Sequence, residues 1–312
     1  MTKISVVIPV YNSEDSLHEL YRRLKASMAT VDNDFEVILV EDGGMDRSWD
    51  IILELSKMDT RIKGLQLSRN FGQHNALLCG IRAAKGEIII TMDDDLQHPP
   101  EEIPTLLVKL SEGYDVVYGT PQKERHEFWR NLASRVIKLG LQASLGVEIA
   151  SKVSSFRVFR TKVRNAFANY EGPFVSIDVL LGWGTKRFAA VPVRHEQRQI
   201  GSSNYTFRKL VTHALNMITG FSTLPLKLAS AIGFTFSLFG FILLGYVVGN
   251  YLIQGAVIPG FAFLASIIAI FSGVQLLTIG IIGEYLGRLY FRSMNRPPYT
   301  IRDQVVSEKE LE

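Results

Sequence analysis

The stretch IIITMDDDLQHPPEE, residues 88–102, places three consecutive aspartates directly after an apolar run. An apolar run of this length, bounded by turn residues, is typical of a buried β-strand. Adjacent carboxylates repel one another, so they need a bound cation or several hydrogen-bond donors nearby. The stretch therefore predicts a strand that ends in a strongly acidic loop, and the rest of the chain has to show what that loop binds.

Residues 1–120 alternate between short β-rich runs and amphipathic stretches. The runs at 4–10, 35–40, 62–68, 87–92 and 115–119 are predicted strands, and helices are predicted to begin near Glu14, Asp46, Gly72 and Pro99. Strands that are apolar throughout and alternate with helices indicate an α/β fold with a mostly parallel sheet covered on both faces. In such sheets ligands bind beyond the carboxyl ends of the strands.

Polar residues follow three of the predicted strands. The segments are PVYNSED (9–15), EDGGMDRSWD (41–50) and DDDLQHPPE (93–101). Gly43 and Gly44 permit close backbone approach, and Asp46 is a predicted N-cap. Ordinary turn chemistry stays an alternative for each loop taken alone. If the loops converge, their oxygen atoms suit a hard cation such as Mg²⁺ or Mn²⁺ that shares its coordination with substrate phosphates.

The C-terminal third has a different composition. No Asp, Glu, Lys or Arg occurs between residues 228 and 283, and the apolar runs at 228–249 and 260–283 are each long enough to cross a bilayer. We predict a hairpin of two transmembrane helices, separated from a soluble domain near 221–227. A pair of buried core helices is the alternative, but core helices seldom run so far without a charged face.

Charge predicts the orientation of this hairpin. Both flanks are basic, whereas the link at 250–259 carries no charge, so the soluble domain is expected on the cytoplasmic side of the inner (plasma) membrane. The N-terminus has too short an apolar run for a secretory signal, and the single cysteine, Cys79, excludes an intramolecular disulfide. The net charge of +3 and the basic residues near the membrane favour lipid headgroups and phosphates over nucleic acid as partners. The flanking basic residues are Arg208, Lys209, Lys227, Arg288, Arg292 and Arg296.

Five motifs in the first part of the chain together resemble glycosyltransferase family 2, in particular its dolichyl-phosphate mannose synthase-like branch. They are VVIPVYNSED (6–15), VILVEDGGMDRSWD (37–50), LSRNFGQHNAL (67–77), IIITMDDDLQHPPEEIP (88–104) and GYDVVYG (113–119). The later motifs RQIGSSNYTFRKL (198–210) and IIGEYLGRLYFRSMNRPPY (281–299), with the two apolar runs, resemble bacterial polyprenyl-phosphate (undecaprenyl-phosphate) glycosyltransferases.

The resemblance implies a domain plan. Residues 1–204 are expected to form a GT-A catalytic domain, a Rossmann-like α/β fold, with an amphipathic helix at about 127–146 that either lies in the membrane interface or packs on the core. A juxtamembrane amphipathic helix (205–226), the transmembrane pair (227–284) and a cytoplasmic tail (285–312) would follow. Glycines in the first span permit close packing, so a homo-oligomer stays open. These glycines are Gly233, Gly240, Gly245 and Gly249.

The resemblance also implies a site. Asp95 and Gln97 are expected to bind Mg²⁺ or Mn²⁺, and Asp93 and Asp95, with Arg157, to be catalytic. Contacts to the nucleotide-sugar are expected from Pro9, Tyr11, Asp42, Asp93 and Asp94. Contacts to the diphosphate and lipid phosphate are expected from Arg125, Arg198, Ser203 and Arg208.

Two positions depart from the family pattern. Ser155 stands where several relatives have an acidic residue, so no general base is assigned there, and Asn204 replaces a frequent lysine. A phosphate acceptor needs no strong base, because its second pKa of about 6 leaves it largely a dianion at neutral pH.

The predicted function is metal-dependent, inverting transfer of a sugar from a nucleotide-sugar, with UDP implied by the resemblance, to polyprenyl phosphate. The product would serve envelope glycan or lipopolysaccharide modification. A non-catalytic membrane-anchored nucleotide-sugar-binding module is one alternative. A polysaccharide synthase is another, disfavoured because the chain has no Arg-Trp pair. His74 and His98 suggest zinc, but no second ligand stands at zinc-site spacing, which favours hydrogen-bonding roles.

Overall fold

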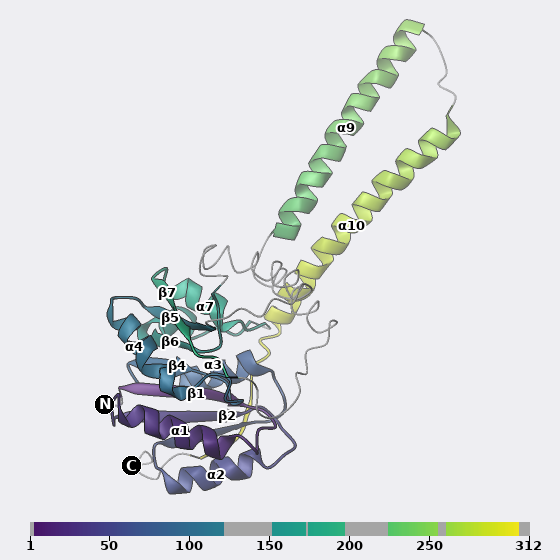
Figure 1. Ribbon diagram of the computed structural model, residues 1–312. Coiled ribbons are helices and arrows are strands. Elements are labelled where there is room, and N and C mark those ends of the chain that lie inside the picture. The colour runs from purple at the N-terminus through teal and green to yellow at the C-terminus, as the bar shows by residue number, and fades with distance from the viewer. Residues whose placement is uncertain (1–2, 122–151, 173, 197–223, 255–259, 306–312) are drawn as a thin grey trace. The chain divides into compact units, whose positions relative to one another are not determined.

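The computed structural model describes residues 3–121, 152–172, 174–196, 224–254 and 260–305. The chain divides into two compact units (Figure 1). The first, the sheet domain, comprises residues 1–211 and 295–312, and the second, the helical unit, comprises residues 212–294.

An eight-stranded sheet forms the centre of the sheet domain, in the order β7-β5-β6-β4-β1-β2-β3-β8. The five strands predicted from periodicity are all present, with ends that differ by at most two residues. The strands are β1 (Ile4–Val10), β2 (Phe35–Glu41), β3 (Ile62–Leu67), β4 (Ile88–Thr91), β5 (Val116–Pro121), β6 (Arg157–Arg160), β7 (Phe188–Val193) and β8 (Ile301–Val305).

Parallel pairing brings the predicted loops to one edge of the sheet. Strands β4, β1, β2 and β3 are neighbours and all parallel, and β5 pairs parallel with β7. The predicted mostly parallel α/β sheet is therefore confirmed. Three strands lie outside the five predicted ones: β6 inserts antiparallel between β4 and β5, β7 pairs parallel with β5, and β8 adds antiparallel to the edge strand β3.

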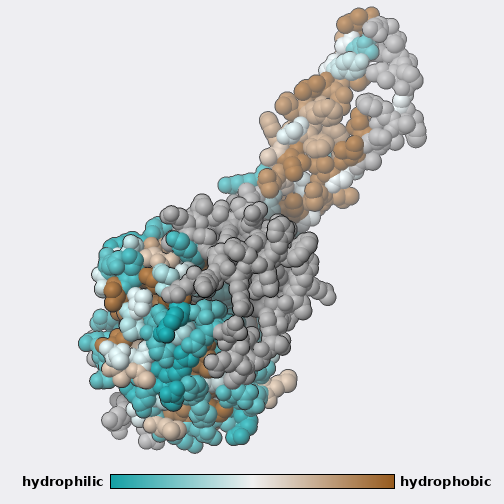
Figure 2. Space-filling model, viewed as in Figure 1, coloured by the Kyte–Doolittle hydropathy of each residue, from teal (hydrophilic) through white to brown (hydrophobic). Residues whose placement is uncertain are grey.

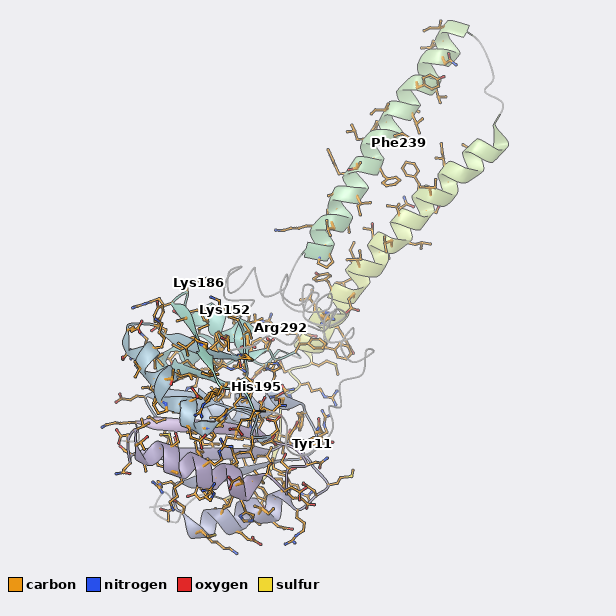
Figure 3. The ribbon with its side chains drawn as sticks, in the orientation of Figure 1. Tyr11, Lys152, Lys186, His195, Phe239 and Arg292 are labelled. Atoms are coloured by element: carbon orange, nitrogen blue, oxygen red, sulfur yellow. The ribbon has the colours of Figure 1, made fainter. Side chains whose placement is uncertain are left out.

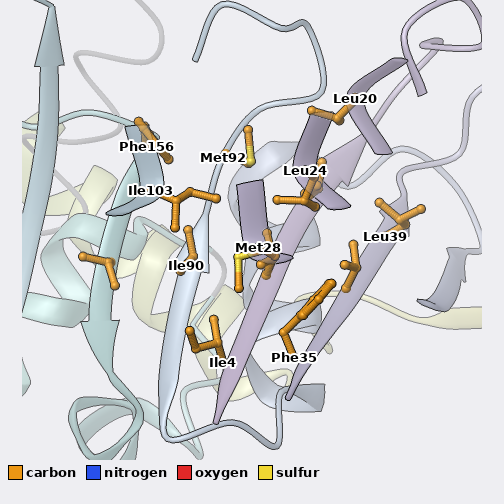
Figure 4. Close-up of a cluster of buried hydrophobic side chains, with 14 of the residues drawn as sticks. Ile4, Leu20, Leu24, Met28, Phe35, Leu39, Ile90, Met92, Ile103 and Phe156 are labelled. Carbon is orange, nitrogen blue, oxygen red and sulfur yellow. The ribbon is translucent and has the colours of Figure 1, made fainter. Parts of the chain in front are cut away.

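Helices cover both faces of the sheet, as its apolar strands require. Alternate side chains of β1, including Ile4 and Ile8, pack with the helices α1, α2 and α4 in one core cluster (Figure 4). Val7 points to the opposite face, where it meets Gly80 of α3. The helical segments are α1 (Leu17–Ala29), α2 (Ser48–Met58), α3 (Gln73–Ala83), η1 (Pro100–Glu102), α4 (Ile103–Ser111), η2 (Thr161–Phe167) and α7 (Ile177–Gly184).

The helical unit consists of α9 (Leu224–Gln254) and α10 (Phe261–Ser293). Each contains a window long and apolar enough to cross a membrane, at Pro225–Asn250 and Ile270–Ser293, and neither window is buried by protein. Much of their surface is brown in Figure 2, where brown marks hydrophobic residues. Their exposure among the described residues disfavours the alternative of buried core helices. The two helices touch through Phe236 and Phe271, whose rings meet edge to face at 5.6 Å.

Helix α10 continues ten residues beyond the predicted end of the second span. Glu284 and Arg288, one helical turn apart, form an ion pair at 2.6 Å that supports this polar extension. The helix ends at Ser293, just before Asn295, which has a positive φ of 47°, and Pro297.

The segment predicted as a C-terminal tail contains a strand of the sheet. Residues 301–305 form β8, so the chain enters the helical unit from the sheet domain and returns to it afterwards. The short, largely exposed sequence IRDQV lacks the apolar pattern of a buried strand, and only pairing with the β3 edge selects its extended form.

We expect Gly80→Ala to destabilise the sheet domain. A Cβ at this position would lie 3.0 Å from Val40 and closer still to Val7, and overpacking of a core costs about 1–3 kcal/mol. The melting temperature should fall by several degrees. Gly245→Ala in α9 is the matched control, because nothing lies within 4 Å of its Cβ position. Equal melting temperatures for the two variants would contradict this account of the packing between α3 and β1.

Candidate active site

Three loops meet at the carboxyl ends of β1, β2 and β4. We name them the β1 loop (residues 11–16), the β2 loop (42–47) and the acidic loop (93–98). The neighbouring strands are in register, with Val10 beside Glu41 and Val7 beside Thr91, so the three loops leave the same edge of the sheet. The predicted convergence of these polar segments is confirmed.

Hydrogen bonds join the β1 and β2 loops directly. Asn12 has a positive φ of 52°, and its side-chain oxygen accepts a hydrogen bond of 2.9 Å from the Met45 amide. The Glu14 amide donates to the Asp46 carboxylate, and the Arg47 amide donates to the Glu14 carboxylate, both at 2.9 Å. Side chains of each loop therefore satisfy the backbone of the other. Helix α2 begins at Ser48, two residues after Asp46, whose carboxylate accepts from the Ser48 amide at 3.1 Å.

Asp42 is buried beneath this junction. Its carboxylate accepts hydrogen bonds from the Phe71 amide at 2.7 Å and the Gly72 amide at 2.8 Å. Burial raises the pKa of Asp42 to about 6, and the two amide donors oppose that rise. The carboxylate thus positions the segment between β3 and α3. Its predicted nucleotide contact stays a prediction.

Gly43 is required for the same junction. Its φ is +66°, and a Cβ would overlap the backbone of Arg69 and Asn70. The predicted close backbone approach at this glycine is therefore present, and it joins the β2 loop to the segment after β3.

The three aspartates of the acidic loop have different partners. Asp93 receives two neutral donors at 2.6 Å: the side-chain amide of Gln73, from the start of α3, and the hydroxyl of Ser155, from the residues before β6. Both carboxylate oxygens of Asp93 are thus oriented by groups far away in the sequence.

Asp94 faces the β1 loop. Its carboxylate accepts from the Tyr11 amide at 3.1 Å and from the Ser13 hydroxyl. Burial raises the pKa of Asp94 to about 6. In this structure Asp94 ties two loops together, and its predicted donor contact stays a prediction.

Asp95 and Gln97 are a fitting oxygen pair for a divalent cation. Both are half-buried, and Leu96 between them is buried with a positive φ of 61°, so the loop is anchored at its centre. The backbone amide of Gln97 donates to the Asp95 carboxylate at 3.1 Å. Among the described residues no group of three or more His, Cys, Asp or Glu side chains could hold a metal. The pair suits Mg²⁺ or Mn²⁺, because these ions complete their coordination with water and substrate phosphates.

His98 and His195 form an aromatic cluster beside the acidic loop. The His98 ring lies 5.2 Å from the ring of His195, which follows β7, and 5.5 Å from that of Phe156. His98 Nδ1 is 4.0 Å from a carboxylate oxygen of Asp93, and burial lowers the pKa of His98. Figure 3 labels His195 and the exposed Tyr11 of the β1 loop. His74 has the hydrogen-bonding role predicted for it, because it accepts from the Ile177 amide at 3.4 Å.

Arg157 lies in the interior of the sheet domain, and its predicted catalytic role stays a prediction. It is 1% exposed and forms a buried ion pair with Asp178, and its Nε donates to Thr91 at 3.0 Å. The hydroxyl of Tyr118 also donates to Asp178 at 3.1 Å. The guanidinium is thus enclosed by a carboxylate, two hydroxyl-bearing side chains and the strands around them. Arg157, in β6, thereby links β6 to Thr91 of β4 and to Asp178 of α7.

Four predicted phosphate-binding residues lie outside the described residues. The amphipathic helix predicted at 127–146 also lies outside them, and so does the one predicted at 205–226, apart from residues 224–226. The four residues are Arg125, Arg198, Ser203 and Arg208. Conversely, sequence reasoning assigned no role to Gln73, although it stands in the motif LSRNFGQHNAL, and noted Ser155 only as a departure. Their function as donors to Asp93 depends on contacts 20 and 62 residues apart.

Comparisons with known proteins agree with this geometry. Residues 5–167 match the family described as glycosyl transferase family 2. The undecaprenyl-phosphate 4-deoxy-4-formamido-L-arabinose transferase of Klebsiella pneumoniae subsp. pneumoniae is 36% identical over 99% of this chain and 95% of that protein. The transferase of the same name from Proteus mirabilis is 36% identical over 99% of this chain and 96% of its own length.

A solved structure has the same fold. Glucosyl-3-phosphoglycerate synthase from Mycobacterium tuberculosis, in complex with Mn²⁺, UDP and phosphoglyceric acid, superposes with a TM-score of 0.51. The match covers 70% of this chain and 76% of that one at 18% identity, so it bears on the fold alone.

The raised pKa of Asp42 predicts a specific pH dependence of stability. The folded state holds this proton more tightly than the unfolded state does. Protonation of Asp42 therefore stabilises the folded state below about pH 4, and this stabilisation is lost as the pH rises through about 6. Asp42→Asn removes the titrating group. It also places the asparagine NH₂ group against one of the two backbone amides, Phe71 or Gly72, that donate to Asp42. We expect the melting temperature of the wild type to decline more than that of Asp42→Asn between pH 4 and 7. Parallel curves for the two proteins would contradict the assignment.

Proposed function

Because the chain belongs to glycosyl transferase family 2, we propose that it transfers a sugar from a UDP-sugar to the phosphate of a polyprenyl phosphate. The product is a lipid-linked monosaccharide, made at the membrane as a donor for modifying lipopolysaccharide or another envelope glycan. The acidic loop carries this proposal: Asp93, Asp95 and Gln97 lie together at the carboxyl edge of the sheet, in a chain that also has two apolar helices.

The similarity to the two undecaprenyl-phosphate transferases supports the choice of acceptor. It extends over at least 95% of each protein, so it includes the apolar helices as well as the sheet domain. A protein that shared only the nucleotide-binding part would match over a shorter region. The sugar named in the relatives is 4-deoxy-4-formamido-L-arabinose, which is the first candidate for this chain.

The reaction replaces one C1–O bond with another. The bond between sugar C1 and the β-phosphate oxygen breaks, and UDP leaves with the electron pair. A phosphate oxygen of the acceptor forms the new bond from the opposite face, which inverts the anomeric centre. The acceptor is already largely a dianion at neutral pH, so alignment in line with C1 supplies much of the catalysis.

The described residues divide this work between them. Pro9, Tyr11 and Asp42 lie at the ends of β1 and β2 and would bind the nucleotide, and Asp93 would face its ribose and sugar. Asp95 and Gln97 would hold Mg²⁺ or Mn²⁺, which when bound offsets the charge that develops on the leaving diphosphate. Arg125, Arg198, Ser203 and Arg208 are proposed to contact the diphosphate and the acceptor phosphate.

The path of the chain supports a multi-pass membrane protein. The chain leaves the sheet domain before α9 and returns to it in β8. A folded domain lies on one side of a membrane, so the number of crossings between these points is even, and two apolar helices satisfy that condition. Lys227 precedes the hairpin, and Arg292 and Arg296 follow it, which favours the cytoplasmic side for the sheet domain.

A donor panel tests the proposal. The detergent-purified protein is incubated with undecaprenyl phosphate, Mg²⁺ or Mn²⁺ and one of several nucleotide-sugars, and sugar in the organic phase is measured. We expect metal-dependent transfer from one donor, lowered roughly 100-fold in Asp95→Asn because a metal ligand is lost. Asp50→Asn, an exposed carboxylate on α2, is the matched control. Failure of every donor to react, with no nucleotide binding, would refute the proposal.

The two donors to Asp93 make a second prediction. Ser155→Ala should lower kcat about tenfold or more, because a hydrogen bond to a charged group contributes about 1.5–3 kcal/mol. Ser155→Thr keeps the hydroxyl and should retain most of the rate. Gln73→Ala should resemble Ser155→Ala. Steady-state kinetics with saturating acceptor distinguish these outcomes, and an unchanged kcat in both alanine variants would exclude a role for this orientation of Asp93.

A further inference from the structure

The segment that follows the second span contacts the sheet domain at both ends of the connection between β3 and α3. We call residues 299–305 the returning segment and residues 68–72 the β3–α3 loop. In the returning segment β8 pairs antiparallel with β3, with Gly64 beside Val305 and Leu67 beside Ile301.

Pairing continues past the end of β3 into the β3–α3 loop. The Ser68 amide donates to the Thr300 carbonyl at 2.9 Å. At the other side, the guanidinium of Arg82 in α3 lies 5.7 Å from the ring centre of Tyr299, which is half-buried. The returning segment therefore contacts the strand before the loop, the first residue of the loop and the helix after it.

The fit between β8 and β3 is close. A Cβ on Gly64 would lie 2.8 Å from the Val305 side chain and 3.2 Å from Trp49, so β8 fills space that only glycine leaves open. Val305 packs against the main core cluster. This edge pairing is part of the folded domain and is stabilised by side chains as well as by backbone hydrogen bonds.

The β3–α3 loop in turn contacts residues of the candidate site. Its Phe71 and Gly72 amides bind the Asp42 carboxylate, and its Arg69–Asn70 backbone occupies the space that the missing Cβ of Gly43 leaves. The next residue, Gln73, donates to Asp93. One short loop therefore orients an acidic residue at the end of β2 and another at the end of β4.

We propose that the returning segment is a positioning element of the donor site, and that nucleotide affinity depends on it through the β3–α3 loop. The nucleotide part of this inference rests on the proposed function. Fixing the backbone of each loop residue costs about 1–2 kcal/mol, and a loop already ordered before binding spares the ligand that cost. The acceptor is not expected to share this dependence, because the β3–α3 loop contacts Asp42 and Gly43, and the adjoining Gln73 contacts Asp93, a set that includes two residues proposed to bind the donor.

The test weakens the returning segment in the full-length protein with the double variant Tyr299→Ala/Val305→Ala. Hydrogen exchange at the amides of residues 68–72, the Kd of UDP and the KM values for donor and acceptor are measured. We expect faster exchange in the β3–α3 loop, about a fivefold or greater increase in the Kd of UDP and in the donor KM, and an unchanged acceptor KM. Val108→Ala, a 65% exposed valine on α4, is the matched control and should behave as the wild type.

Two results would overturn the inference. One is wild-type exchange at residues 68–72 in a variant whose β8 amides exchange faster, and the other is faster loop exchange with unchanged UDP affinity. If the double variant does not fold, Tyr299→Ala alone serves, with Tyr299→Phe, which keeps the ring over Arg82, as the rescue. Exchange and UDP binding need no sugar transfer, so a failure of the proposed function is seen separately, as a wild type that binds UDP and transfers nothing.

Discussion

Repulsion among three adjacent carboxylates is the constraint on which the carboxyl edge of this sheet depends. The structure relieves it by giving each aspartate its own surroundings. Asp93 is held by the neutral donors Gln73 and Ser155, and Asp94 turns toward the backbone and a hydroxyl of the β1 loop. Asp95 accepts a hydrogen bond from the backbone amide of Gln97, two residues on. Loops from β1, β3 and the start of β6 are drawn to the end of β4 to supply these partners.

The buried ion pair between Arg157 and Asp178 supports the same loop from inside the domain. Arg157 and Thr91 both donate to the Ser155 carbonyl, at 3.4 and 2.8 Å. The ion pair therefore helps to fix the backbone of Ser155, just before β6, in the position from which its hydroxyl donates to Asp93. Burying two charges is costly unless every polar atom is satisfied, and here Thr91 and Tyr118 take part in the network. Arg157 therefore contacts the candidate site through the Ser155 carbonyl.

The returning segment connects the two apolar helices to the β3–α3 loop of the candidate site. Only seven residues separate the end of α10 from β8, and they include Pro297 and Pro298, whose fixed φ limits the freedom of the connection. On the proposal above, the nucleotide site is complete only in a chain whose two apolar helices have already been made. This arrangement suits an enzyme whose acceptor is a membrane lipid.

Local pattern in the sequence determined much of this protein. Strand periodicity located β1 to β5, the absence of charge between residues 228 and 283 located the two apolar helices, and the acidic run after β4 located the site. These features depend on neighbours within a few residues, through side-chain alternation and the length an apolar helix needs. Tertiary structure alone decided that β6 and β8 join the sheet antiparallel, that Asp94 faces inward and that Arg157 is buried. Each of those outcomes depends on a partner between 21 and more than 200 residues away, such as Asp178 for Arg157 or β3 for β8, and no local pattern specifies which distant group will supply the hydrogen bond or the opposite charge.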